Sequence, residues 1–421
     1  HHYYVASLSE LASYYSGLGN YSKAVEFGTQ ALNIAKQLFS ESHPYYATSL
    51  SDLAVYYSHL GNYSKAVELG TQALNIFKQA LGSTHPDYAT SLCNLALCYS
   101  NLGNYSKAVE LGTQALNIRK QVLGESHPDY AASLSGLASD YSYLGNYSKA
   151  VELGTQALNI FKQLFGETHP YYASSLSDLA SYYSFLGDYS KAVELGTQAL
   201  NIRKQVLGET HPYYATSLSD LARYYSYLGN YSKAVELDTR ALNVRKQVLG
   251  ESHPDYATSL SNLASYYSYL GDYSKAVELG TQSLNILKQA LGATHPDYAA
   301  SLSNLASYYL YLGDYSKAVE LGTQALDIRK QVLGESHPDY ANSLNGLACY
   351  YSNLGNYSKA VELGTQATNI LKQVFGESHP GYAISLSGLA SYYSNLGNYS
   401  KAVELGTQAM NIRKQIGRAH V

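Results

Sequence analysis

Apolar and small residues recur along this sequence at intervals of three or four positions, in paired stretches that glycine separates. The two stretches of one pair place them at Tyr46, Leu50, Leu53, Ala54, Tyr57 and Leu60, and then at Ala66, Val67, Gly70, Ala73, Leu74 and Phe77. These intervals follow the 3.6-residue period of an α-helix. Gly61 and Gly82 follow the two stretches, and glycine ends helices readily because it adopts positive φ angles without a Cβ penalty. Each pair of stretches therefore predicts a helical hairpin.

The hairpin pattern repeats every 42 residues. All nine prolines occur in His-Pro pairs at this spacing, from His43-Pro44 to His379-Pro380, and the string Tyr-Ser-Lys-Ala-Val-Glu occurs ten times. One hairpin cannot bury its apolar faces alone, whereas stacked hairpins can. We therefore expect an all-α solenoid of ten helix-turn-helix repeats over residues 1–415, with helices at about positions 3–17 and 21–39 of each repeat and no strand. The repeats begin at residues 1, 43, 85, 127, 169, 211, 253, 295, 337 and 379.

Polar and small residues at fixed positions predict how each hairpin closes and packs. Asn62, which Asp replaces in three repeats, can cap the second helix through its side-chain oxygen. This role is favoured over glycosylation of the Asn-Tyr-Ser motif, because Asp preserves the oxygen but cannot carry a glycan. Gly70 lies inside the second helix, where glycine costs about 0.5–1 kcal/mol. We expect a ring of the Tyr56-Tyr57 pair to fill the space that this glycine leaves.

The charge balance argues against nucleic acid and membranes as partners. The net charge is −4 and only 14% of residues are charged, whereas nucleic-acid capture needs clustered Lys and Arg. No apolar run approaches the roughly 18 residues of a membrane span. The three cysteines, Cys93, Cys98 and Cys349, support neither a disulfide framework nor a zinc site. We therefore expect a reducing, cytoplasmic compartment.

Residues suited to chemistry recur once per repeat instead of converging on one site. Equivalent histidines of stacked repeats are expected about 10 Å apart, which is too far for one metal ion whose bonds are about 2 Å long. We interpret these histidines as connectors beside helix starts, where Ser126 and Asp129 resemble a capping box. Catalysis needs one converging constellation. We therefore expect no enzyme activity, no cofactor and no metal.

The residues Leu53-Ala54, Tyr57, Leu60-Gly61, Tyr63, Ala66 and Ala73-Leu74 resemble the tetratricopeptide repeat signature. The 42-residue form, which opens on His-Pro-Asp-x-Ala, is similar to the repeats of kinesin light chains. This resemblance implies a right-handed superhelix whose first helices line a concave groove that holds partner peptides. Family members that grip acidic peptides use Lys and Arg in that groove. The corresponding residues of one repeat here are Thr216, Ser219, Asp220 and Arg223.

Position 17 of the repeat, just before Leu-Gly, varies among nearly constant neighbours. Five consecutive repeats have an aromatic residue there: Tyr143, Phe185, Tyr227, Tyr269 and Tyr311. These rings either pack between repeats or form a ladder that anchors a partner, since Tyr is favoured at binding hot spots. Together with Arg223 they are the predicted partner-binding residues of the groove. Asp238 replaces the helix glycine of one repeat, and a carboxylate in that place needs a partner.

These features predict a scaffold that binds a partner protein or peptide in its groove. Two alternatives stay open: a regulatory or sensor array of a larger signalling protein, and a structural spacer that assembles head to tail. The second would use apolar end surfaces near Tyr4, Leu8 and Leu11. Residues 416–421 break the repeat and match one reading frame of a common sequencing adapter. We interpret them as an assembly artefact on a fragment of a longer reading frame, with a natural frayed terminus as the alternative.

Overall fold

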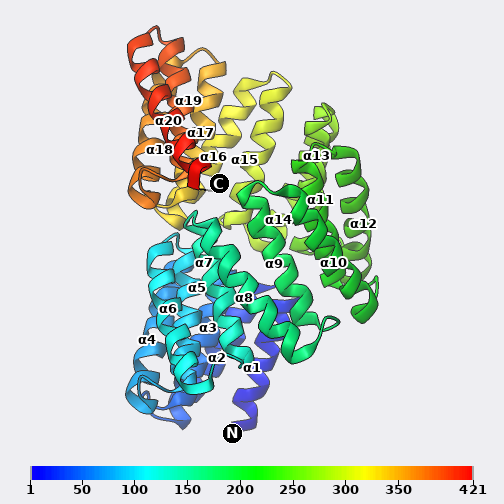
Figure 1. Cartoon of the computed structure of the whole chain (residues 1–421), viewed down its shortest axis with the longest axis vertical. Helices are drawn as coiled ribbons and strands as arrows, with labels where there is room; N and C mark the ends of the chain where they lie inside the picture. Colours follow the sequence, from blue (N-terminus) through cyan, green and yellow to red (C-terminus); the bar gives the residue numbers. More distant parts are fainter. Residues whose placement is uncertain (1, 420–421) are drawn as a thin grey trace. The chain divides into compact units, whose positions relative to one another are not determined.

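The structure, a computed structural model, describes residues 2–419, in which it has twenty α-helices and no strand, as predicted (Figure 1). The first helices of the ten repeats are α1 (His2–Gly17), α3 (Pro44–His59), α5 (Pro86–Asn101), α7 (Pro128–Tyr143), α9 (Pro170–Leu186), α11 (Pro212–Tyr227), α13 (Pro254–Tyr269), α15 (Pro296–Tyr311), α17 (Pro338–Asn353) and α19 (Pro380–Asn395). The second helices are α2 (Tyr21–Leu38), α4 (Tyr63–Leu81), α6 (Tyr105–Leu123), α8 (Tyr147–Phe165), α10 (Tyr189–Leu207), α12 (Tyr231–Leu249), α14 (Tyr273–Leu291), α16 (Tyr315–Leu333), α18 (Tyr357–Phe375) and α20 (Tyr399–Ala419). Gly61 and Gly82, which close the hairpin of α3 and α4, have φ angles of 80° and 88°.

The hairpins form two compact stacks, residues 1–255 and residues 256–421, called here the N-terminal and C-terminal parts. Within each part, a first helix packs against its own second helix and against the second helix of the preceding repeat. Neighbouring first helices also contact each other, for example α7 with α9 and α17 with α19. No comparable contact joins neighbouring second helices in the part of the chain that the structure describes. The first helices are therefore closer together and line the concave side of each stack.

Polar side chains cap both helices of the hairpin. The Asn62 side-chain oxygen accepts a hydrogen bond from the Lys65 backbone N–H at 3.2 Å, which confirms the predicted cap. The prediction of a capping box at Ser126 is wrong, because the N-cap of α7 is His127. Its Nδ1 accepts a hydrogen bond from the Asp129 backbone N–H at 3.1 Å, which requires that this nitrogen carry no proton. The recurring histidine is therefore a helix cap.

A tyrosine ring fills the space beside most of the helix glycines, but it comes from the following repeat, so the prediction that a ring of the Tyr56-Tyr57 pair lies beside Gly70 is wrong. A Cβ added to Gly196 in α10 would lie 3.2 Å from Cε2 of the fully buried Tyr224 in α11. Tyr56 accordingly faces Gly28 of the preceding repeat and not Gly70 of its own. Position 28 meets position 14 of the next repeat in the same way at Gly28–Tyr56, Gly154–Tyr182, Gly280–Tyr308, Gly322–Tyr350 and Gly364–Tyr392.

Two repeats lack the ring at position 14. Cys98 occupies this position in repeat 3 and Asp140 in repeat 4, and both side chains are buried. A leucine side chain is then the nearest neighbour of the preceding glycine, as for Leu137 beside Gly112. The ring is therefore not essential at every interface, but its absence changes the packing of that interface.

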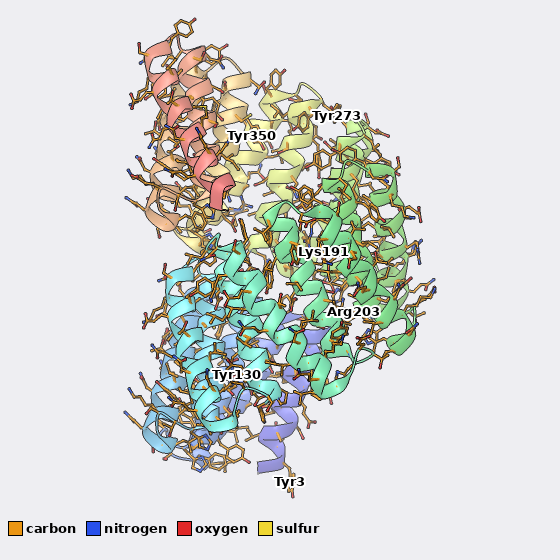
Figure 2. The ribbon with its side chains drawn as sticks, viewed as in Figure 1. Tyr3, Tyr130, Lys191, Arg203, Tyr273 and Tyr350 are labelled. Atoms are coloured by element: carbon orange, nitrogen blue, oxygen red, sulfur yellow. The ribbon has the colours of Figure 1, made fainter. Side chains whose placement is uncertain are left out.

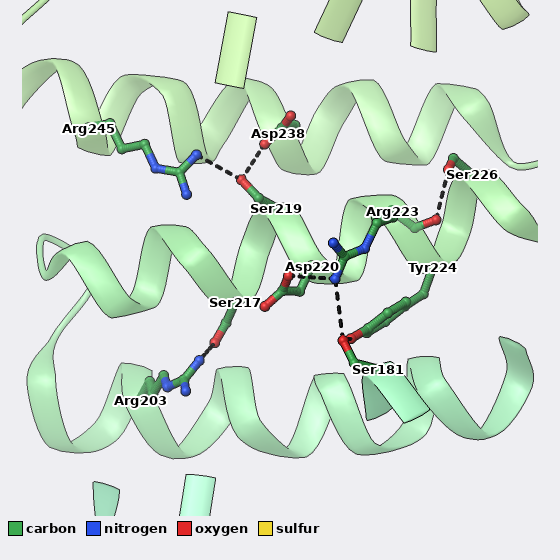
Figure 3. Close-up of polar contacts among 10 residues, drawn as sticks. All are labelled: Ser181, Arg203, Ser217, Ser219, Asp220, Arg223, Tyr224, Ser226, Asp238 and Arg245. Atoms are coloured by element: carbon green, nitrogen blue, oxygen red, sulfur yellow. Dashed lines mark hydrogen bonds and ion pairs between the residues drawn. The ribbon is translucent and has the colours of Figure 1, made fainter. Parts of the chain in front are cut away.

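Asp238 takes the place of the helix glycine in repeat 6 and is completely buried. The Ser219 hydroxyl donates a hydrogen bond to its carboxylate and accepts one from Arg245 at 3.1 Å, so the three side chains form a chain from α12 to α11 and back (Figure 3). A buried carboxylate is costly unless hydrogen bonds or charges compensate it. The serine and the arginine supply that compensation. Ser219 is therefore buried between helices and does not face the groove, contrary to the expectation from its position.

Arginine at position 35 of several second helices reaches between neighbouring first helices. Arg203 of α10, labelled in Figure 2, donates a hydrogen bond to Ser217 of α11 at 2.5 Å (Figure 3). It donates a second one to Ser174 of α9 at 3.3 Å. Phe or Leu fills the same position in other repeats, as Phe161 does in repeat 4. Each interface thus has either a hydrogen-bonded guanidinium or an apolar side chain at this point.

The exposed surface at the start of α1 differs from the one predicted. Leu8 is only 5% exposed, so the expectation of an exposed Leu8 is wrong; position 8 is buried in every repeat, including this one. The exposed side chains are Tyr3, Tyr4 and Tyr14, and Tyr3 projects from the start of the helix (Figure 2). Aromatic side chains thus make up much of this surface.

The contact between ring and glycine predicts a difference between two Gly→Ala variants. A Cβ at Gly322 would lie 2.9 Å from Cε2 of the buried Tyr350, whereas nothing lies within 4 Å of a Cβ added to Gly406. Gly322→Ala should lower stability by on the order of 1–3 kcal/mol because the ring must move. Gly406→Ala should raise it by up to about 1 kcal/mol through helix propensity. Thermal unfolding followed by circular dichroism measures both, and equal effects would contradict the proposed packing.

Because Asp140 is buried, we expect its replacement to increase the stability of the fold by an amount that depends on pH. Burial raises the pKa of Asp140 from 3.8 to about 7. Between these values the folded chain holds a proton that the unfolded chain releases, so stability falls as the pH rises through this window. Asp140→Asn should therefore raise the free energy of unfolding at pH 8 by on the order of 1–3 kcal/mol and leave it nearly unchanged at pH 4. Chemical denaturation at both pH values tests this, with the exposed Asp327→Asn as the control; a gain that is independent of pH would contradict it.

Candidate functional site

A pocket of about 470 Å³ opens among three first helices of the N-terminal part. Every residue that lines it comes from a first helix, so it lies on the concave side. The lining residues are Ser135, Gly136, Ser139, Ser142 and Tyr143 of α7, Asp178, Ser181, Tyr182 and Phe185 of α9, and Arg223 of α11. Three of the predicted site residues, Tyr143, Phe185 and Arg223, therefore line one hollow.

A glycine in repeat 4 accounts for the position of the pocket. Gly136 stands at position 10, where the next two repeats have Asp178 and Asp220, and a Cβ added to it would meet nothing within 4 Å. Asp140 stands at position 14, where most repeats have tyrosine. The missing side chain of Gly136 leaves volume unfilled in the pocket, whereas Asp140 lies toward Gly112 of α6 and is not among the lining residues. The hollow thus depends on a residue that varies among the repeats.

The rings of Tyr143 and Phe185 line the pocket and also pack between repeats. Each side chain is 53% exposed. Tyr143 stacks on Tyr105 and Phe185 on Tyr147, the tyrosines that begin the preceding second helices, with ring centroids 5.5 Å apart in both pairs. Stacked aromatic pairs prefer this offset geometry. The rings are thus held in place while about half of their surface stays open; a role in binding stays a prediction.

The other predicted rings do not line this pocket. Tyr227 is exposed and packs at a tilt against Tyr189, with centroids 5.2 Å apart. Tyr269 and Tyr311, in the C-terminal part, are also exposed, and Tyr311 stacks on Tyr273 at 5.3 Å. The ring contact at position 17 therefore recurs in both parts. Its first two aromatic members, Tyr143 and Phe185, line the pocket described above.

Arg223 lines the pocket but already has a counter-charge. Its Nη2 atom lies 2.9 Å from Oδ1 of Asp220, one helical turn earlier in α11, and 3.5 Å from the Ser181 hydroxyl of α9 (Figure 3). The same hydroxyl lies 3.2 Å from the hydroxyl of Tyr224. The guanidinium thus ties α11 to α9, and its charge is largely neutralised by the neighbouring carboxylate.

Asp178 is absent from the predicted site residues, yet it is the carboxylate of the pocket. It is open to solvent on one side, and among the described residues it accepts no hydrogen bond and forms no ion pair. Partial desolvation by the walls of the hollow raises the pKa of Asp178 to about 6; Arg203 lowers it and Asp220 raises it further. Position 10 varies among Glu, Asp, Asn and Gly in the sequence. That variation, seven residues before position 17 and on the same helix face, is the signal that could have identified it.

The residues that line the pocket are chemically suited to contact a side chain of another protein. No group of three or more His, Cys, Asp or Glu in residues 2–419 could hold a metal ion. No helix of the described chain combines the length and apolarity that crossing a membrane requires. The pocket itself offers hydroxyls, two rings, one carboxylate without a hydrogen-bond donor and one paired guanidinium.

A known family matches this sequence along almost its whole length. The model of the tetratricopeptide repeat matches residues 3–79, 72–121, 87–163, 129–205, 197–247, 227–289, 281–331, 323–373 and 366–415. No curated protein matches the sequence.

Solved structures with similar repeats include three of different kinds. The nearly identical repeats of a candidate kinesin light chain from Podosopora anserina are 33% identical over 49% of this chain and 97% of theirs, with a TM-score of 0.41. A Rap protein complexed with competence and sporulation factor is 15% identical over 88% of this chain and 99% of its own, with a TM-score of 0.60. A signal transduction ATPase with a tetratricopeptide repeat sensor from Pyrococcus horikoshii is 16% identical over 88% of this chain and 53% of its own, with a TM-score of 0.48.

The resemblance noted in the sequence thus extends to a family model that covers successive repeats and to hairpins that stack as the repeat requires. The chain belongs to the tetratricopeptide repeat family.

Proposed function

We propose that the chain is a protein-binding scaffold that holds a segment of a partner protein against the first helices of repeats 4 to 6. The observation that carries this proposal is the pocket among α7, α9 and α11, which two half-exposed rings line. A volume of about 470 Å³ lies within the usual range of ligand pockets. The proposal extends to a reducing, cytoplasmic compartment, in which Cys93, Cys98 and Cys349 stay free thiols.

The ordered rings support binding on energetic grounds. A side chain that is mobile before binding loses rotamer freedom when a partner immobilises it, at about 0.5–1.5 kcal/mol. Tyr143 and Phe185 are already held by their stacking partners, so most of this cost does not arise. Aromatic rings with low ordering cost are favoured as binding hot spots.

A regulatory or sensor array is the same proposal within a larger protein. The Rap protein, whose fold this chain shares, was solved in complex with competence and sporulation factor, so an array of this fold does accommodate a bound factor. A sensor would use the same pocket and would pass the binding event to a further domain. The residues that bind are common to both versions, and a test of the pocket therefore tests both.

Removing the two rings should weaken binding of the partner segment. Peptides selected from a random display library against the whole chain provide the probe. Replacing Tyr143 and Phe185 together with Ala should weaken their binding by at least roughly tenfold, because hot-spot rings contribute about 1–2 kcal/mol or more each. Fluorescence anisotropy with labelled peptide measures the affinity.

The control for this experiment changes the same position in repeats without an aromatic residue. Asn353 and Asn395 occupy position 17 in repeats 9 and 10, and replacing both with Ala should leave the affinity unchanged. Circular dichroism checks that both double variants keep their helices. Selected peptides that bind the ring variant as tightly as the unchanged chain would contradict the proposed function.

We also propose that the 421-residue chain associates end to end through the same contact that joins its repeats. Tyr14 at position 14 is 64% exposed, and nothing lies within 4 Å of a Cβ added to Gly406 at position 28. The ring of one copy fits the space beside this glycine of another, a heterologous contact that builds open assemblies. Sedimentation velocity should show larger species as concentration rises, and Gly406→Phe should abolish them. A chain that stays monomeric at every concentration would exclude this mode.

A further inference from the structure

We propose that the pocket among α7, α9 and α11 takes a cationic side chain, lysine or arginine, of the bound segment, with Asp178 as its counter-charge. This inference rests on the proposed function and adds the chemistry of the partner. The proposed partner is basic, whereas family members that bind acidic peptides use Lys and Arg in the groove.

The charged groups around the pocket favour a cation because only a carboxylate is open. Arg223 is paired with Asp220 at 2.9 Å. Arg203 is 7% exposed, and its two terminal nitrogens donate to serine hydroxyls of the two flanking helices. Asp178 lines the hollow without a hydrogen-bond donor or an ion-pair partner among the described residues. An entering anion would find no open guanidinium, whereas an entering cation would find an open carboxylate.

The hollow is built so that a side chain of some length reaches this carboxylate. Gly136 faces Asp178 from the neighbouring helix without a side chain, and nothing lies within 4 Å of a Cβ added to it. The Tyr143 and Phe185 rings line the same hollow. A cation over an aromatic face gains about 0.5–2 kcal/mol, and the methylene stem of a lysine or arginine packs well on rings. The rings and the carboxylate therefore act on different parts of one such side chain.

Several groups around the pocket act on one neighbouring side chain, the phenol of Tyr182. Burial is the main cause of the raised pKa of Tyr182, and Asp178, Tyr143 and Asp140 each raise it further. All three groups therefore lie within electrostatic reach of a single hydroxyl, which donates to the Ser135 carbonyl at 3.5 Å. Negative charge accumulates around this point as the carboxyls ionise. A cation in the hollow would offset the partial desolvation of Asp178 that raises its pKa to about 6.

The test uses the whole chain and a random peptide library displayed on phage. Selection against the unchanged chain should enrich lysine or arginine at one position of the bound peptides. Asp178→Asn should weaken the binding of the selected peptides by roughly tenfold or more, as expected when one member of a charge pair is removed. The matched control is Asp52→Asn, which changes the same position of the repeat in repeat 2. The first helices around Asp52 have Gly17, His59 and Asn101 at position 17, and therefore no tyrosine or phenylalanine there. It should leave binding unchanged.

A double-mutant cycle separates contact from indirect effects. The cationic residue of a selected peptide is replaced with glutamine, and both peptides are titrated into the unchanged chain and into Asp178→Asn. The peptide change should weaken binding to the unchanged chain by roughly tenfold and have little further effect on the variant. Additive losses would overturn the pairing. Thermal unfolding should show Asp178→Asn to be at least as stable as the unchanged chain, since the carboxylate makes no hydrogen bond and desolvation disfavours its ionised form in the folded chain.

The outcomes distinguish this inference from the function on which it rests. Selected peptides that are acidic or purely apolar, and that still depend on Tyr143 and Phe185, would overturn the cationic partner and leave the scaffold function standing. Peptides that depend on neither the rings nor Asp178 would overturn both proposals. Cationic peptides that depend on Asp178 and on the rings support both.

Discussion

The structure depends on one close contact, the packing of a tyrosine ring from one repeat on a glycine in the second helix of the repeat before it. A side chain at the glycine position would occupy the space of the ring, as the 2.9–3.2 Å approaches to an added Cβ show. The glycine costs helix stability, and the buried ring offsets that cost through apolar burial. Because the same contact recurs in most repeats, it sets a nearly constant step between hairpins. Short contacts between neighbouring first helices then place these helices on the concave side.

The candidate site arises where that constant step is interrupted. Repeat 4 has Asp140 in place of the ring and Gly136 in place of a larger side chain. The neighbouring repeat keeps its own ring, Tyr182, and adds Asp178. A nearly uniform array thus acquires a local hollow where Gly136 replaces a larger side chain. This explains how repeats of almost identical sequence can present one distinct surface.

The sequence was sufficient to predict the hairpins because their signals are local. Helix bounds and the Asn62 cap follow from short-range periodicity and backbone chemistry, whereas the ring beside each helix glycine comes from another repeat, which periodicity within one repeat does not reveal. The cap at His127 was assigned to the adjacent serine, because spacing alone does not distinguish two neighbouring acceptors. Leu8 was placed at an exposed end because burial within the first hairpin depends on the facing of its helices, which periodicity does not resolve.

The candidate site was predictable only in part. Tyr143, Phe185 and Arg223 stand out as variable positions on one helix face, and all three line the hollow. The hollow itself depends on residues of two repeats seen together in space. The pairing of Arg223 with Asp220, which leaves Asp178 as the open charge, is likewise a matter of side-chain geometry. Sequence indicated which positions vary, but not which of them meet.

The central claim is that a partner segment lies against the first helices at this hollow, and site-specific photo-cross-linking tests it most directly. The photoreactive benzoyl derivative of phenylalanine would replace Phe185 of α9 in one protein and Phe165, an exposed residue at the end of the second helix α8, in another. A peptide selected against the unchanged chain is then added and irradiated. Cross-linking from position 185, and little or none from position 165, is the result that the account predicts. Equal cross-linking from both positions, or cross-linking from position 165 alone, would contradict it.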